Sequence, residues 1–249
     1  MTTLLANGCS HTAGAEIEYT LQNKCYEKAW PKRLADDMGW NWINLAQSGN
    51  SNEQIKRTTI DWIIENVELS NRYKVDELIV MIMWSGFNRF EVWNNQTKKL
   101  TSVSGNWMRS CRDNIKDSAE LCEYVKYRTI IDNDSVAEYR SLMEVYLTAR
   151  YLESLNIKYY FMNALYSWKN PTSFEQDELR PNYKLLYDAY GNRQKRHLGF
   201  SLNTEQFHQY LRDQKISVSE HSELDHWGVE GHKAWKDHVK NWMKRIDNV

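Results

Sequence analysis

Four short polar segments of the chain carry the residue types that acyl-transfer chemistry needs. Ser10 is a weak nucleophile until a base removes its hydroxyl proton, and His226 is the candidate base. A carboxylate beside that histidine would fix its tautomer and stabilise the imidazolium. Fixed N–H donors would hold the oxyanion of a tetrahedral intermediate. The four segments are Gly8-Cys9-Ser10-His11-Thr12, Asn44-Leu45-Ala46-Gln47-Ser48-Gly49-Asn50, Trp84-Ser85-Gly86-Phe87-Asn88-Arg89 and Glu223-Leu224-Asp225-His226, with Gly231-His232 close behind.

Short apolar runs lead into the first three of these segments and predict strands. The run from Leu78 to Trp84 is continuously apolar, as expected for a strand that is covered on both faces. Thr3 to Ala6 and Trp42 to Ala46 are two further strands, and Ile157 to Leu165 is a fourth. Apolar residues at helical spacing lie between and after these runs. They predict helices over Trp30 to Met38, Ile55 to Val67, Tyr139 to Leu152 and Trp235 to Ile246.

The alternation of strands and helices predicts an α/β fold, with a parallel sheet covered by helices on both faces. Ligands of such sheets bind at the carboxyl ends of the strands, where the first three polar segments begin. Two stretches, about 90–133 and 166–202, lack this alternation. We interpret them as insertions in a single domain of residues 1–249.

In their order and placement, the four segments resemble the SGNH (GDSL-type) hydrolase superfamily. The Gly-Asp-Ser block of that family corresponds to Gly8-Cys9-Ser10, and the Asn and Gly of its second block correspond to Asn44 and Gly49. The Gly-x-Asn-Asp block corresponds to Gly86-Phe87-Asn88-Arg89, and the Asp-x-x-His block to Glu223-Leu224-Asp225-His226. Each motif alone is weak, and the signal is their common order. The resemblance implies a three-layer α/β/α fold around a central parallel sheet of the flavodoxin-like type.

The resemblance also implies a serine ester hydrolase that works through an acyl-enzyme on Ser10, with His226 as the base. The oxyanion hole would consist of the backbone N–H groups of Ser10 and Gly49 and the side-chain amide of Asn88. An esterase or acetylesterase activity on a small-molecule or carbohydrate acyl ester is the leading hypothesis. An acyltransferase on the same fold is an alternative, since it differs only in the acceptor of the acyl group.

Two carboxylates compete for the role of triad acid. Glu223 occupies the family's position, three residues before His226. Asp225 is adjacent to His226, and neighbours in an extended segment point to opposite sides, which favours Glu223. Cys9 and Arg89 stand where the family has acidic residues. These departures keep a third alternative open, in which the fold is retained by a binding or structural protein with altered chemistry.

Several other side chains offer chemistry that we consider weaker. Cys9 is an alternative nucleophile, but it is expected to be a small buried residue. His11 is expected to be a loop residue, and His232 to pack at the start of the last helix. His221, His226 and His232 show no H-E-x-x-H or Cys/His pairing, so we predict no metal site and no cofactor.

Basic and aromatic residues gather in or near the two insertions. The basic run could contact an anionic substrate or nucleic acid, but it is interpreted as a solvated loop because the net charge of the chain is only -1. The aromatic residues would either line a substrate pocket or form the cores of two small subdomains. The basic run is Arg193, Lys195, Arg196 and His197, and the aromatic residues are Trp93, Trp107, Tyr166 and Trp168.

The composition is that of an ordinary globular protein, with 41% hydrophobic and 26% charged residues in a chain of 249. The balance of 32 basic and 33 acidic residues argues against a nucleic-acid binder. Neither a signal peptide nor an apolar run of membrane-spanning length is visible. The four cysteines show no C-x-x-C spacing. We therefore expect a cytoplasmic protein with reduced thiols and no membrane partner; no feature of the sequence sets its oligomeric state.

Overall fold

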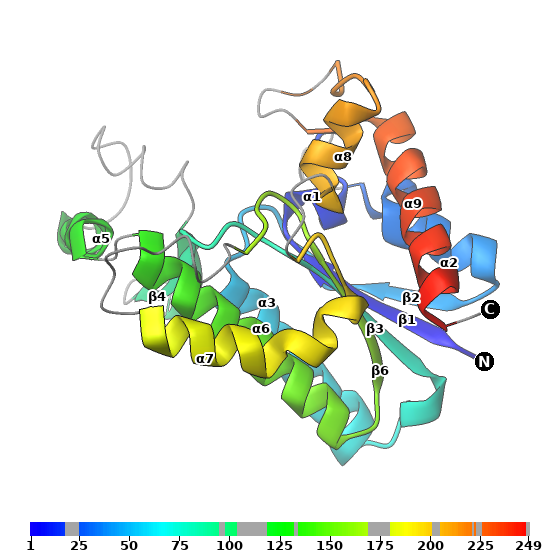
Figure 1. The fold of residues 1–249 in the computed structure, drawn as a ribbon, viewed down its shortest axis with the longest axis horizontal. Helices are drawn as coiled ribbons and strands as arrows, with labels where there is room; N and C mark the ends of the chain where they lie inside the picture. Colours follow the sequence, from blue (N-terminus) through cyan, green and yellow to red (C-terminus); the bar gives the residue numbers. More distant parts are fainter. Residues whose placement is uncertain are drawn as a thin grey trace.

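The computed structural model describes residues 1–17, 25–94, 98–103, 119–131, 134–168, 180–200, 205–220, 222 and 226–247. Its centre is a five-stranded parallel sheet with the strand order β2-β1-β3-β6-β7 (Figure 1). The strands of this sheet are β1 (Thr3–Gly8), β2 (Asn41–Asn44), β3 (Leu78–Trp84), β6 (Lys158–Asn163) and β7 (His197–Leu198). A separate antiparallel pair is formed by β4 (Phe90–Asn94) and β5 (Lys99–Val103).

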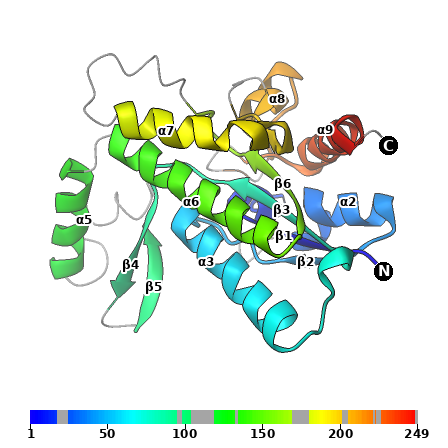
Figure 2. The same ribbon diagram turned by 60° about the horizontal axis from the view of Figure 1, so that its bottom comes forward.

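Helices cover both faces of the sheet, which gives the predicted three layers (Figure 2). One face packs against α3 (Asn52–Ile63), α6 (Asp134–Ser154) and α7 (Arg180–Tyr190). The other face packs against α2 (Trp30–Met38), α8 (Phe207–Asp213) and α9 (Val229–Asp247). The other helices of the described residues are α1 (Ser10–Ala13), α5 (Ala119–Ile131), the π-helical η2 (Ile64–Leu69) and the 3-10 turns η1 (Tyr26–Lys28), η3 (Val75–Glu77) and η5 (Gly191–Arg196).

The core is divided in two by the sheet, and β3 supplies both halves. Val80 and Ile82 belong to the cluster that contains α3, α6 and α7, whereas Met81 and Met83 belong to the cluster that contains α2, α8 and α9. All seven residues of β3 are buried. Successive side chains of a strand point to opposite faces, so a strand with helices on both sides must be apolar throughout. The prediction from the run Leu78 to Trp84 is thereby confirmed.

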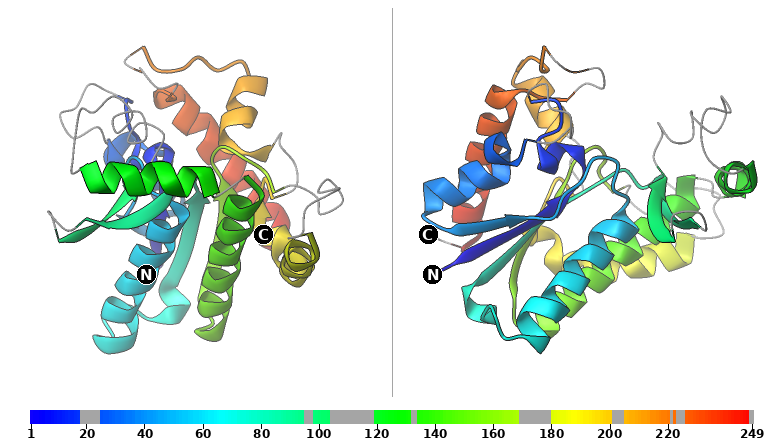
Figure 3. Two further views of the ribbon diagram at one scale, coloured as in Figure 1. Left: turned by 90° about the vertical axis from the view of Figure 1, so that its left-hand side faces the viewer. Right: turned by 180° about the vertical axis from the view of Figure 1, so that it is seen from behind.

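The first expected insertion is a small unit at one end of the molecule. The β4–β5 hairpin and α5 lie away from the chain termini (Figure 3). They share a small apolar cluster of their own, made of Phe90, Val92, Val103 and Val125. Of the aromatic residues in this stretch, Trp93 is 54% exposed, and Trp107 lies outside the described residues.

The second expected insertion, 166–202, is in part a component of the main fold. It supplies α7 to one helical layer and β7 to the sheet, where His197 pairs with Phe161 and Leu198 with Met162 of β6. A strand of two residues is too short to give a periodic signal, which is why the sequence did not predict it. Trp168 is buried in the main core, whereas Tyr166 is 46% exposed.

Two residues of the basic run, Arg193 and His197, have structural roles. The Arg193 guanidinium donates to both carboxylate oxygens of Glu153, at 2.8 and 2.8 Å. His197 is 3% exposed and bonds Asn163 and Tyr190. Both side chains therefore tie η5 and β7 to the body of the protein, and the expectation of a solvated loop is wrong for them.

Among the described cysteines, Cys122 differs from the expectation of reduced thiols. Cys9 and Cys25 are free, and Cys9 is completely buried in the core, as predicted. Cys122 in α5 is disulfide-bonded, so the expectation is wrong for this residue. Cys111 lies outside the described residues.

Candidate active site

Ser10 begins α1 at the point where β1 leaves the sheet. The turn requires glycine at position 8, since a Cβ there would lie 2.3 Å from the Thr12 Oγ1 atom and 2.8 Å from the Met83 carbonyl oxygen. The Cys9 carbonyl then accepts from the N–H groups of Thr12 and Ala13, both at 3.0 Å, which closes the first helical turn. Ser10 is 6% exposed, and its hydroxyl makes no hydrogen bond to a described residue. Bonds between a nucleophile and its base often tighten only when substrate binds.

The segment that follows β2 is tied to the Ser10 segment by two asparagines. Asn44 Nδ2 donates to the Thr12 carbonyl at 2.9 Å, and Asn50 Nδ2 donates to the Gly8 carbonyl at 3.0 Å. Between them Gly49 has a φ of +84°, a left-handed conformation that favours glycine. The turn therefore presents the backbone of Gly49 at the same edge of the sheet as Ser10.

The segment that follows β3 lies on the other side of β1. Gly8 pairs with Met83, so the two strands end at nearly the same level. Asn52 fixes the start of this loop, because its amide accepts from Ser85 N–H at 2.7 Å and donates to the Ser85 carbonyl at 3.2 Å. Arg89 N–H then donates to the Gly86 carbonyl at 3.3 Å, which closes a turn that leaves Asn88 exposed.

Three predicted N–H donors are unpaired at this edge. Within the part of the chain that the structure describes, the Ser10 and Gly49 backbone N–H groups and the Asn88 side-chain amide donate no hydrogen bond. Polar groups at a protein surface that lack an internal partner are available to water or to a ligand. The edge of the sheet therefore carries free donors on three adjacent loops.

His226 is hydrogen-bonded to a carboxylate from the opposite end of the sequence. Its Nδ1 lies 2.8 Å from Glu16 Oε2, and the two side chains are only 8% and 13% exposed. Glu16 follows α1 by three residues and therefore belongs to the segment that begins with Ser10. A carboxylate on Nδ1 leaves Nε2 as the ring nitrogen with a free lone pair in the neutral imidazole.

Two serines fix the Glu16–His226 pair. The Ser222 hydroxyl donates to Glu16 Oε2 at 2.6 Å and accepts from His226 N–H at 2.7 Å. The Ser219 hydroxyl donates to the Glu16 carbonyl at 2.6 Å, and Ser219 N–H donates to the His226 carbonyl at 2.8 Å. Glu16 itself has a φ of +59°, which is uncommon for a residue with a side chain and occurs where surrounding contacts enforce it.

The two carboxylates that we expected beside His226, Glu223 and Asp225, lie outside the described residues. Glu16 was not among the sequence candidates. It is separated from His226 by 210 positions, and no motif relates the two. The only signal was a carboxylate six positions after Ser10, which is too common a feature to have singled it out.

His11 brings the first and last polar segments into contact. It is buried in α1, with its ring centroid 4.9 Å from that of His226 and 5.0 Å from that of Phe207. Burial holds the pKa of His11 well below its usual value, and the neighbouring His226, His208 and Arg89 lower it further. His11 is therefore a neutral ring packed against the candidate base rather than a loop residue.

The remaining candidates have structural positions. His232 is 1% exposed, and its Nδ1 accepts from the Trp30 N–H at 3.2 Å, which joins the start of α9 to α2, as expected. In the described part of the chain, no group of three His, Cys, Asp or Glu side chains is placed to hold a metal ion. His221 lies outside the described residues. No helix among the described residues combines the length and apolarity needed to cross a membrane.

A family model described as "Family of unknown function (DUF6071)" matches residues 14–189, which is more than half of the chain. The chain belongs to the DUF6071 family. The matched region contains Glu16, Gly49 and Asn88, but it begins after Ser10 and ends before His226. A comparison with curated proteins finds no match.

Several solved structures are similar in fold to this DUF6071 chain. The psychrotrophic esterase EstA from Pseudoalteromonas sp. has a TM-score of 0.50 at 13% identity, with 100% of each chain covered. TesA has a TM-score of 0.50 at 11% identity, covering 98% of this chain and 99% of its own. A member of the lipolytic G-D-S-L family from Veillonella parvula DSM 2008 has a TM-score of 0.47 at 12% identity, with 97% of each chain covered. The α/β/α fold with a central parallel sheet, as in SGNH hydrolases, is confirmed; at these identities the likeness concerns the fold alone.

Proposed function

We propose that this protein is a serine ester hydrolase and a divergent member of the SGNH superfamily. One observation carries the proposal. The Glu16–His226 pair, joined by a 2.8 Å hydrogen bond, is held against the segment that contains Ser10 at the carboxyl edge of the sheet. A serine, a buried histidine and a carboxylate on the far nitrogen of that histidine are the groups of a serine-hydrolase triad.

In the first half of the proposed reaction, Ser10 Oγ attacks the acyl carbon of the ester while His226 Nε2 takes the hydroxyl proton. Glu16 accepts the hydrogen bond from Nδ1–H and stabilises the imidazolium that forms. The carbonyl π electrons move to oxygen, which becomes the oxyanion. When the oxyanion collapses, the bond to the alcohol oxygen breaks, and the alcohol leaves with the proton from His226. The acyl group remains on Ser10.

The second half releases the acyl group to water. His226 Nε2, now neutral, takes a proton from the attacking water, and a second tetrahedral oxyanion forms on the acyl carbon. Its collapse breaks the bond to Ser10 Oγ, which recovers the proton from His226. The products are one carboxylic acid and one alcohol for each ester and each water consumed.

The oxyanion of both steps would be bound by the unpaired donors of three loops. These are the backbone N–H groups of Ser10 and Gly49 and the side-chain amide of Asn88. Donors that are fixed before the reaction stabilise the developing charge without reorganising at the moment of attack. The positions of Gly8, Asn44 and Asn50 support this assignment, since they fix the two backbone donors at the edge of the sheet.

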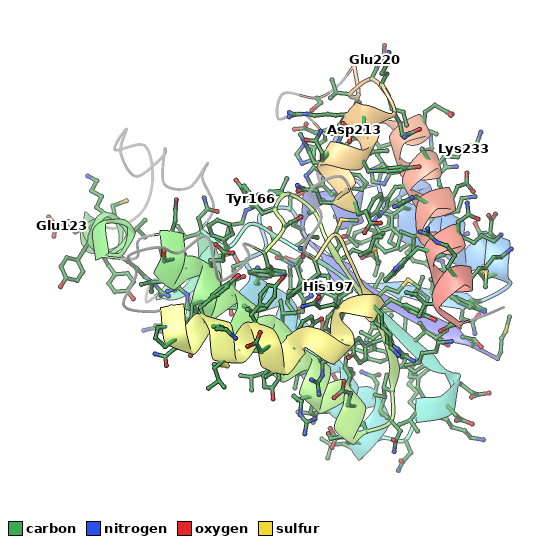
Figure 4. All side chains as sticks on the ribbon, viewed as in Figure 1. Glu123, Tyr166, His197, Asp213, Glu220 and Lys233 are labelled. Atoms are coloured by element: carbon green, nitrogen blue, oxygen red, sulfur yellow. The ribbon has the colours of Figure 1, made fainter. Side chains whose placement is uncertain are left out.

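We expect small-molecule or carbohydrate acyl esters as substrates. Phe87 and Tyr166, with ring centroids 5.0 Å apart, stand beside Asn88 and offer an aromatic surface to such a substrate. Figure 4 shows Tyr166 at the end of the sheet toward which β1 and β3 run. The reaction uses side-chain acid–base chemistry and backbone donors, so we expect activity to survive dialysis against a chelator.

Covalent labelling tests the proposal directly. Treatment with a fluorophosphonate should add one probe molecule to Ser10, seen by intact mass and peptide mapping, because the phosphorus mimics the tetrahedral acyl carbon. EstA, which shares the fold, has been solved inhibited by monoethylphosphonate. The Ser10→Ala variant should not be labelled, and its hydrolysis of an ester panel should fall by about 10⁴-fold or more.

The exposed Ser70, at the end of η2, supplies a matched control. Ser70→Ala should be labelled and active like the wild-type protein. An adduct on another residue, or equal labelling of Ser10→Ala, contradicts the proposal. Addition of acceptor alcohols to the assay distinguishes hydrolysis from acyl transfer, since a transferase would form a new ester in place of the acid.

A further inference from the structure

Arg89 is a cation at the candidate active site that forms no ion pair with a described residue. It directly follows Asn88 in the turn after β3 and is half-buried. Its Nη1 donates to the Asn50 carbonyl at 3.4 Å, a long hydrogen bond that places the guanidinium over the loop that carries Gly49. Arg89 also lies near enough to His11 to act on its charge. The guanidinium therefore sits among the segments of Ser10, Gly49 and Asn88.

Two other arginines of the protein form bidentate ion pairs with carboxylates. Arg57 donates to both oxygens of Glu91, at 2.7 and 3.2 Å, and Arg193 does the same with Glu153. Arg89, in contrast, has no carboxylate within 4.0 Å among the described residues. The carboxylate of Glu16, which belongs to the candidate site, is already engaged by His226 and Ser222.

We propose that Arg89 binds a carboxylate or phosphate group of the substrate, so that the preferred substrate is an anionic ester. This inference rests on the proposed function and specifies its substrate class. A guanidinium presents paired N–H donors that match the oxygens of a carboxylate or phosphate. A half-buried cation without a counter-ion is costly, and a bound anion would compensate it.

A role for Arg89 in the oxyanion hole fits the structure less well. Three N–H donors without a described partner already stand on the loops after β1, β2 and β3. The Arg89 guanidinium instead donates to the Asn50 carbonyl, beside the loop that carries the Gly49 donor. A contact with a non-reacting group of the substrate lowers KM, whereas a contact with the oxyanion raises kcat, so kinetics separate the two roles.

The aromatic pair Phe87–Tyr166 suggests the shape of a suitable probe. Phe87 precedes Arg89 by two residues, and Tyr166 is 46% exposed beside the same turn. A flat ring that bears an acetyl ester and an anionic group would lie against these aromatics and reach Arg89. Three acetyl esters make a matched set: 4-acetoxybenzoate, its neutral methyl ester and 4-acetoxyphenyl phosphate.

Binding is measured first, in the Ser10→Ala variant, which cannot turn the esters over. Calorimetry should give the anionic esters at least about tenfold tighter binding than the methyl ester, and the tighter of the two identifies carboxylate or phosphate. Arg89→Gln in this background should abolish the preference, and Arg89→Lys should keep part of it because the charge remains. The control Arg72→Gln should retain the full preference, since Arg72 is an exposed arginine before β3, at the opposite edge of the sheet.

The active enzyme provides an independent measurement. In wild type, kcat/KM should be at least about tenfold higher for an anionic ester than for the methyl ester, mainly through KM. This ratio should fall toward one in Arg89→Gln and in high salt, which screens the interaction. Hydrolysis of all three esters at equal efficiency overturns the inference but leaves the proposed function standing.

The remaining outcomes are equally decisive. Tight, Arg89-dependent binding of the anions without any turnover by the wild-type protein refutes the proposed hydrolase and retains the anion site. A preference that persists in a folded Arg89→Gln variant overturns the inference. If Arg89→Gln fails to fold, Arg89→Lys and the salt dependence of wild type decide instead, and a preference that is independent of salt counts against Arg89.

Discussion

Among individual residues, Glu16 shows how the fold can place a carboxylate beside the candidate base although no sequence motif indicates it. It reaches His226 because the turn after α1 carries Glu16 beneath the loop that precedes α9, where Ser219 and Ser222 bind it. Its left-handed backbone is the cost of that placement, and such strained residues cluster at functional sites. The same turn thus follows the candidate nucleophile and provides the partner of the candidate base.

The substitution Glu16→Gln tests this arrangement. It keeps the size of the side chain but removes the charge that would stabilise the His226 imidazolium, and its amide can select the wrong imidazole tautomer. We expect kcat for ester hydrolysis to fall by about 10²- to 10⁴-fold, with the melting temperature little changed. The control Glu230→Gln, on an exposed carboxylate of α9, should be as active as wild type.

The contrary result would come from the residues near His226 in sequence. If Glu16→Gln retains nearly full activity while Glu223→Gln or Asp225→Asn is inactive, the carboxylate of the triad is one of the latter. Those two variants should otherwise remain active, because His226 Nδ1 already has its partner in Glu16.

The positions of the other site residues could be predicted where the residue directly follows a predicted strand. Ser10, Gly49 and Asn88 each follow a strand of the parallel sheet, and parallel strands bring their carboxyl ends to one edge. Their proximity therefore follows from the fold class. The partners of Arg89 and His11 could not be predicted in this way, since they depend on how the loops are directed after the strands end.

Among the secondary-structure elements, the accuracy of prediction followed the strength of the apolar pattern. The bounds of β3 and α2 were predicted to the residue, because one is continuously apolar and the other has Pro31 in its first turn and Gly39 directly after its last residue. The elements α7 and β7 were missed inside an expected insertion. A strand as short as β7 carries no periodicity, and it is held by its pairing with β6 rather than by its own sequence.

The junction of β1 with α1 is the element on which the position of Ser10 depends, and Gly8→Ala tests it. The added Cβ would overlap the Thr12 side chain and the Met83 backbone, at 2.3 and 2.8 Å, and the backbone atom cannot rotate away. We expect the free energy of unfolding to fall by about 1–3 kcal/mol, measured by urea denaturation. Activity per folded molecule should fall as well, since Ser10 would be displaced.

Gly191→Ala is the control for this substitution. A Cβ at position 191 would meet no other atom within 4 Å, so an alanine should leave stability and activity nearly unchanged. A Gly8→Ala protein with the stability and activity of wild type would show that the junction adjusts freely, and the positioning argument for Ser10 would lose its basis.

Across the whole molecule, a buried neutral histidine joins the layers on each side of the sheet. His197 Nε2 and Nδ1 lie 2.9 and 2.9 Å from Asn163 Oδ1 and the Tyr190 hydroxyl, which connects β7 with β6 and α7. On the other side, His232 Nδ1 accepts the Trp30 N–H and connects α9 with α2. Burial lowers the pKa of each to about 3, since a charged imidazole would lose its hydration there.

These two histidines predict that the fold weakens in mild acid. In the unfolded chain a histidine titrates near pH 6.5, so between about pH 6.5 and 3 the unfolded state binds more protons than the folded state. The stabilisation is fully present above pH 6.5 and is lost as the pH falls, by about 1.4 kcal/mol per pH unit for each such histidine. The carboxylates whose pKa is lowered, such as Asp37 and Asp247, titrate in the unfolded chain near 3.8 and add their effect at lower pH.

Urea denaturation at a series of pH values between 6.5 and 5 measures this dependence. The free energy of unfolding of wild type should fall steadily as the pH is lowered over that range. His197→Gln or His232→Gln should each reduce the slope of this free energy against pH by the equivalent of about one proton, whatever its effect on absolute stability. Because only the slope is compared, a variant that loses packing still reports on its missing proton. A flat profile in wild type, or variants with the same slope as wild type, would mean that these imidazoles already carry a proton in the folded protein. The assignment of His232 Nδ1 as a neutral acceptor of the Trp30 N–H would then be wrong.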